Sequence, residues 1–66
     1  MGSTTIQTKS LTILEDQMQH ELLACKKARQ YAQSFDNPAL KNLADATANH
    51  HRERFDRLFN YLNSHA

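Results

Sequence analysis

The sequence predicts an all-α fold, an antiparallel hairpin of two helices that cover about residues 11–35 and 38–63. The 66 residues contain one glycine, Gly2, and one proline, Pro38, so neither predicted helix has an internal breaker. Apolar side chains recur at spacings of three and four in both segments, which is the period of an amphipathic helix. Because only two or three residues join the segments, the helices must fold back against each other.

The first predicted helix is rich in Leu, Ala, Gln, Glu and Lys, which all favour helix. Ser10 and Thr12 compete as its N-cap, and Thr12 with Glu15 has the spacing of a capping box. The preceding residues 1–10 are predicted to be a flexible tail. The side chains expected to face the second helix, at heptad spacing, are Leu11, Leu14, Met18, Glu21, Cys25, Ala28, Ala32 and Phe35.

The second predicted helix has a well-marked start. Asn37 is a favoured N-cap residue, and Pro38 is well tolerated at the first helical position. Residues 64–66 are predicted to form a short C-terminal tail. The side chains expected to face the first helix are Leu40, Leu43, Ala44, Thr47, His51, Phe55, Leu58 and Leu62.

One polar residue interrupts each apolar stripe, Glu21 in the first helix and His51 in the second. Each lies 15 residues from residue 36, so both are expected at the same level, roughly 22 Å from the turn. Arg54 lies one helical turn beyond His51 and can also approach Glu21. Buried charges usually persist only in pairs, so the sequence predicts a structural pair of Glu21 with Arg54 or His51. Arg54 is the favoured partner, because its fixed positive charge could hold the bundle centre together without a metal.

A metal site is the second interpretation of these residues, because a carboxylate and an imidazole are both metal ligands. In a twofold dimer, Glu21 and His51 would supply two carboxylates and two imidazoles, a set that suits zinc or another divalent ion. His20 and His50 would be neighbours of such a site. Cys25 has no basic cluster or redox motif beside it, so it is expected to be a small core residue.

Composition excludes several classes of function. Eight Lys and Arg against seven Asp and Glu give a net charge of +1, and the signs are interleaved, so nucleic-acid binding is not predicted. There is no apolar run near the ~20 residues that span a bilayer. A single cysteine and the lack of an apolar leader favour the cytoplasm. The sequence contains no familiar catalytic motif, so an enzyme is not expected.

The apolar stripes are too wide for one hairpin to cover. Leu22 and Leu23 widen the first stripe, and Phe59 and Tyr61 widen the second. A core from fewer than ~70 residues rarely contributes more than roughly 5 kcal/mol, and the chain has no disulfide to add to it. The sequence therefore predicts a homodimer or larger homo-oligomer in which two hairpins form a four-helix bundle.

Three segments carry a family resemblance, over about residues 11–63: Leu14–Glu21, Asn37–Leu43 and the His-rich Ala48–His51. With them the chain resembles the ferritin-like spore coat protein F family. It is also similar to the hairpin half of rubrerythrin-type and encapsulated-ferritin proteins, in which two copies build a four-helix bundle. The resemblance implies the same ferritin-like bundle here, with other spore coat proteins as partners and the spore coat as a second location.

The resemblance also bears on metal binding. Glu21 matches the first ligand position of the family. The family's second Glu position is occupied here by His51, and its His position is occupied by Arg54, which does not bind iron. The resemblance thus implies a degenerate metal site and a non-catalytic structural protein without cofactor. The alternative is a metal-binding protein that holds iron or zinc through Glu21 and His51 across a dimer.

Overall fold

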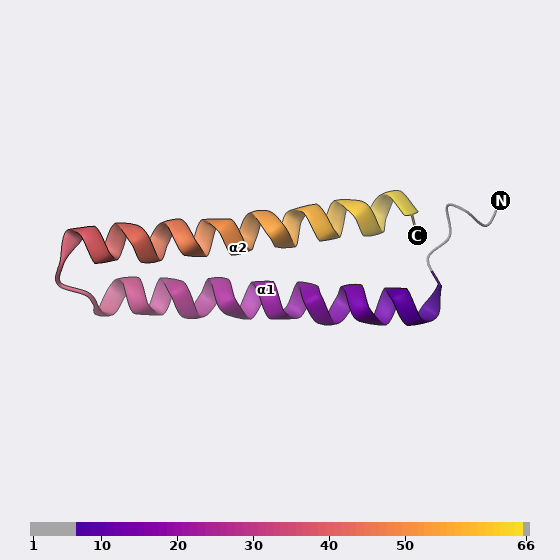
Figure 1. The fold of residues 1–66 in the computed structure, drawn as a ribbon, viewed down its shortest axis with the longest axis horizontal. Coiled ribbons are helices and arrows are strands. Elements are labelled where there is room, and N and C mark those ends of the chain that lie inside the picture. The colour runs from indigo at the N-terminus through magenta and orange to yellow at the C-terminus, as the bar shows by residue number, and fades with distance from the viewer. Residues whose placement is uncertain (1–6, 66) are drawn as a thin grey trace.

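The computed structural model describes residues 7–65, and these residues form two helices and no strand. Helix α1 covers Thr8–Ser34 and helix α2 covers Pro38–His65. The two helices run antiparallel side by side along their whole length, joined by residues 35–37 at one end (Figure 1). The predicted all-α helical hairpin is confirmed. Within residues 7–65, neither helix is long and apolar enough to cross a membrane.

Helix α1 begins at Thr8, earlier than the predicted residue 11. Gln7 occupies the N-cap position without a side-chain cap, and its carbonyl oxygen accepts from the Leu11 amide at 2.9 Å. The capping box expected at Thr12 is wrong, because the Thr12 hydroxyl donates to the Thr8 carbonyl oxygen at 3.1 Å. No residue between Thr8 and Ser10 breaks a helix, so the helix extends into the predicted tail. Residues 1–6 of that tail lie outside the described residues.

The turn is capped as the sequence predicts. The Asn37 side-chain oxygen accepts from the amides of Ala39 at 2.8 Å and Leu40 at 3.2 Å. A cap of this type contributes about 1 kcal/mol. Phe35 is extended, with φ −83° and ψ 134°, and its amide still donates to the Tyr31 carbonyl oxygen at 3.2 Å. These contacts end one helix and start the next within three residues.

Helix α2 continues two residues past the predicted end at 63. His65 explains the extension. Its Nδ1–H donates to the Tyr61 carbonyl oxygen at 2.8 Å, and its ring stacks on the Tyr61 ring with centroids 3.9 Å apart. The last turn is thereby held in helical geometry, so residues 64 and 65 of the predicted tail are helical, while Ala66 lies outside the described residues.

The residues that α1 turns toward α2 are the predicted ones. All eight are buried or half-buried, and Glu21, Cys25, Ala28 and Ala32 are the most buried. In α2 the prediction holds from His51 onward but is wrong near the turn, where Leu40, Leu43 and Thr47 are exposed. Lys41 and Ala48 take their places. Ala48 is 0% exposed and packs in the core with Cys25 and Ala28, so small side chains let the helices approach closely there.

The core between the helices is thin. Among residues 7–65 no large side chain is fully buried. Eight large apolar side chains are instead between 44% and 64% exposed: Ile13, Leu22, Leu23, Tyr31, Leu40, Leu43, Phe59 and Tyr61. A single hairpin therefore leaves most of its large apolar side chains in contact with water.

Candidate functional site

The centre of the candidate site is a contact between Glu21 of α1 and His51 of α2. The Nδ1–H of His51 donates to Oε1 of Glu21 across 2.6 Å, a short hydrogen bond to a carboxylate oxygen. The two residues are 30 positions apart in sequence and meet because each lies the same number of residues from the turn. The predicted juxtaposition of Glu21 and His51 is thus present.

Gln17 donates a second hydrogen bond to the Glu21 carboxylate. It lies one helical turn before Glu21, and its Nε2 donates to Oε2 of Glu21 at 2.8 Å. Only 7% of the Glu21 side chain is exposed, against 22% for His51. Within residues 7–65 no buried side-chain nitrogen or oxygen lacks a hydrogen-bond partner. The buried carboxylate is fully satisfied by protein groups, which removes most of the cost of burying it.

Hydrogen bonding dominates the electrostatics of Glu21. The hydrogen bond from His51 lowers the pKa of this carboxyl below its ordinary value of 4.5, against the opposing effect of burial. The hydrogen bond from Gln17 and the electrostatic effects of His51 and Arg54 lower the pKa further. Glu21 is therefore ionised at neutral pH although it is buried.

Arg54 does not pair directly with Glu21 within the hairpin, so the favoured one of the two predicted pairs is absent and His51 is the direct partner. No nitrogen of Arg54 lies within 4.0 Å of a carboxylate oxygen in the described part of the chain. Arg54 is exposed and lines a shallow groove of about 230 Å³ with Gln17, Glu21, Arg57 and Leu58. Its charge acts on Glu21 from this groove, while His51 takes the direct contact because it lies on the side of α2 that faces α1.

The arrangement has a specific consequence for metal binding. Glu21 Oε1 and His51 Nδ1, the nearest pair of candidate ligand atoms, are bonded to each other, so a metal between them would have to break that bond. His20 and His50 are exposed, and within residues 7–65 no three His, Cys, Asp or Glu side chains form a group that could hold a metal ion. In a single hairpin the described residues place Glu21 and His51 side by side, with no third candidate ligand grouped with them. Ligation by Glu21 and His51 across two copies stays a prediction.

A network of charged side chains lies on one broad side of the hairpin. Arg29 of α1 donates to Asn49 Oδ1 of α2 at 2.9 Å and approaches Asp45 at 3.9 Å. Arg52 donates to Asp56 at 3.2 Å, and these pairs are exposed. Exposed pairs of this kind contribute less than about 1 kcal/mol each. This network is not evident from the sequence pattern, and neither is the role of Gln17, although its spacing of four from Glu21 was an available signal.

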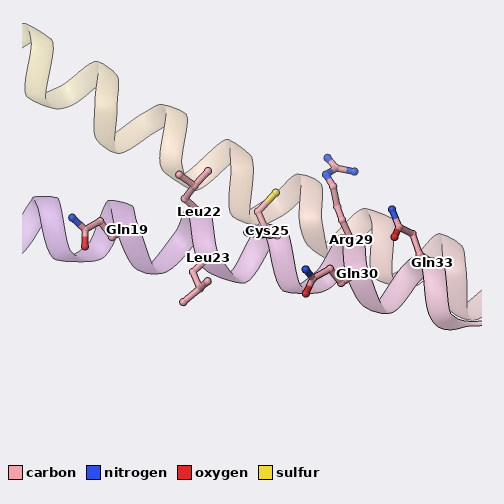
Figure 2. Close-up of a pocket in the computed structure, with 8 residues that line it drawn as sticks. Gln19, Leu22, Leu23, Cys25, Arg29, Gln30 and Gln33 are labelled. Carbon is pink, nitrogen blue, oxygen red and sulfur yellow. The ribbon is translucent and has the colours of Figure 1, made fainter.

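A second groove, of about 670 Å³, lies beside this network but has no features of a ligand site. All its lining residues come from α1, among them Leu22, Leu23 and Arg29. Leu22 and Arg29 point toward α2, whereas Leu23 points away from it (Figure 2). Because the side chains diverge rather than converge, they do not enclose a small molecule. Cys25 also borders the groove but is buried in the core, as expected.

Comparison with known proteins identifies no matching family model, and no curated protein or solved structure has significant similarity to the chain.

The lowered pKa of Glu21 predicts a loss of stability in acid. The folded protein binds the proton of the Glu21 carboxyl less tightly than the unfolded chain does. The contribution of ionised Glu21 to stability is therefore complete above pH 4.5 and is lost as the pH falls through the folded-state pKa. Urea unfolding at about pH 5 and about pH 3 measures the loss. Glu21→Gln is expected to lose less stability over this range, whereas Glu15→Gln, which removes an exposed carboxylate of the same helix, should match the wild type. Equal losses for all three proteins would contradict the assignment.

Proposed function

We propose that this chain is a non-catalytic structural module in which two hairpins associate into a ferritin-like four-helix bundle. The observation that carries the proposal is the exposure of eight large apolar side chains over a core made mainly of small ones. A second copy is the simplest way to cover these side chains, because a short chain cannot bury them alone. This function requires a surface and a fixed geometry, and needs no catalytic residue.

In this proposal the Glu21–His51 pair fixes the alignment of the two helices. A shift of one helical turn would separate the two side chains and leave a buried carboxylate without its partner. Breaking a buried pair in this way costs about 3 kcal/mol. Apolar contacts alone are less selective, since Leu and Ala side chains can pack in several registers. A fixed register gives each hairpin one surface to present to a partner.

The resemblance to spore coat protein F supports a role within an assembled protein layer. A long, slender bundle can make repeated lateral contacts with its neighbours. In this proposal the partners are other copies of the chain and other spore coat proteins, and the location is the cytoplasm or the spore coat.

The alternative function is binding of a divalent metal such as zinc or iron. It rests on the buried Glu21–His51 pair, which two copies would double to two carboxylates and two imidazoles. It requires the 2.6 Å contact between Glu21 and His51 to open so that both residues can turn to the ion. Arg54 opposes this step, because its charge in the adjoining groove repels a cation.

One pair of measurements on protein without a histidine tag tests the proposal. Sedimentation equilibrium at micromolar concentration is expected to give twice the chain mass of 7.6 kDa, and elemental analysis is expected to find less than stoichiometric metal. A folded monomer would contradict the structural proposal. Stoichiometric zinc or iron that is lost in both Glu21→Ala and His51→Ala would instead establish the metal-binding alternative.

A further inference from the structure

The two broad sides of the hairpin differ in chemistry. One carries the Arg29–Asp45 and Arg52–Asp56 pairs. The other contains the groove that Gln17 and Glu21 of α1 form with Arg54 and Leu58 of α2. We call this second side the apolar face. Residues three, four or seven positions apart lie on the same side of a helix, so the groove residues identify the other members of this face. The apolar face consists of Ile13, Gln17, Ala24 and Tyr31 in α1, and Leu40, Leu43, Thr47, Arg54, Leu58 and Tyr61 in α2.

From this asymmetry we propose that a second copy docks on the apolar face with both turns at the same end of the bundle, so that Arg54 of each copy lies against Glu21 of the other. The inference rests on the proposed dimer and specifies its geometry. Five of the eight exposed large apolar side chains lie on this face: Ile13, Tyr31, Leu40, Leu43 and Tyr61.

The size of the face suits a second hairpin. A helix of 28 residues is about 42 Å long, and two packed helices are roughly 20 Å wide, so the face covers on the order of 800 Å². This is the area that each partner contributes to a stable interface of ordinary size. The opposite side carries exposed ion pairs, which would have to be dehydrated or rearranged to become an interface.

The levels of the apolar side chains are compatible with this orientation. Because residue 21 lies opposite residue 51, Ile13 is level with the region of Leu58 and Tyr61, and Tyr31 is level with the region of Leu40 and Leu43. When both turns lie at the same end, α1 of one copy faces α2 of the other. Apolar residues then meet apolar residues at both ends of the bundle.

The charges at mid-length favour the same orientation. With both turns at one end, Arg54 of each copy approaches the Gln17 and Glu21 level of the other, and the guanidinium meets the edge of an ionised carboxylate. With the turns at opposite ends, α2 would face α2, and the two Arg54 side chains would meet near the axis. Like charges in contact oppose that arrangement.

The length of the hairpin makes the orientation measurable. In a Cys25→Ala background, a nitroxide label is attached to Asp36→Cys in the exposed turn, and the distance between the labels is measured by double electron–electron resonance. The expected distance is below about 30 Å, whereas turns at opposite ends would be about 40 Å apart or more. A dimer with the longer distance overturns the orientation alone. A monomer by sedimentation overturns the orientation and the proposed function together.

Matched substitutions test which face is used. Leu43→Glu places a charge on the apolar face, and Leu23→Glu places the same charge outside it, at residues that are 64% and 55% exposed. Leu43→Glu is expected to weaken dimerisation at least roughly tenfold, with helical content by circular dichroism retained, and Leu23→Glu is expected to keep the wild-type mass. Retention of the dimer by Leu43→Glu, or its loss in Leu23→Glu alone, would overturn the assignment of the face.

Discussion

Replacing Ala48 by leucine is expected to destabilise the hairpin by about 2 kcal/mol or more. Ala48 is 0% exposed where α2 packs against Cys25 and Ala28 of α1. A leucine there adds volume at a fully buried position, so the helices must separate or the side chain must take a strained rotamer. Urea unfolding followed by circular dichroism measures the effect.

The matched control for this change is Ala46→Leu, in the same helix. Ala46 is exposed, so the larger side chain meets solvent and stability is expected to stay within about 0.5 kcal/mol of the wild type. Equal unfolding midpoints for Ala48→Leu and Ala46→Leu would show that the helices do not approach closely at Ala48.

Replacing Glu21 by leucine is expected to cost about 1 to 3 kcal/mol, because the donors of His51 and Gln17 lose their buried acceptor. Adding His51→Leu is expected to recover that loss or exceed it, since an apolar pair of similar volume often replaces a buried polar pair at no net cost. Urea unfolding of the wild type, both single variants and the double variant forms a complete cycle.

The coupling energy from this cycle is expected to show that the effects of the two single changes do not add. A Glu21→Leu variant as stable as the wild type would contradict the view that Glu21 is the acceptor for both donors. Additive effects of Glu21→Leu and His51→Leu would contradict a direct contact between the two side chains.

The sequence was sufficient to place the candidate pair. The rise of a helix per residue is constant and the turn is short, so counting from residue 36 put Glu21 and His51 at one level, 15 positions away on each side. The stripe of α1 was predictable for a similar reason, since its apolar residues keep one spacing for the whole helix. Asn37 and Pro38 were recognisable because cap chemistry is local.

The errors have physical causes that a single sequence does not contain. Near the turn, α2 offers two stripes, one with Leu40 and Leu43 and one with Ala44 and Ala48, and only packing against α1 selects the smaller side chains. Arg54 was a plausible partner by spacing, but which side chain reaches the carboxylate depends on the rotation of α2 about its own axis.

The capped turn also sets an order in which the structure can assemble. Residues next to the turn are close in sequence, and contacts farther along the hairpin close progressively larger loops, at an entropic cost that grows only as the logarithm of loop length. Once the segment around Asn37 has formed, each pair of facing residues brings the next pair together. We expect the part of the hairpin next to the turn to form first and the ends near Leu11 and Leu62 to form last. Because most contacts join residues that are close in sequence, folding is expected to be fast.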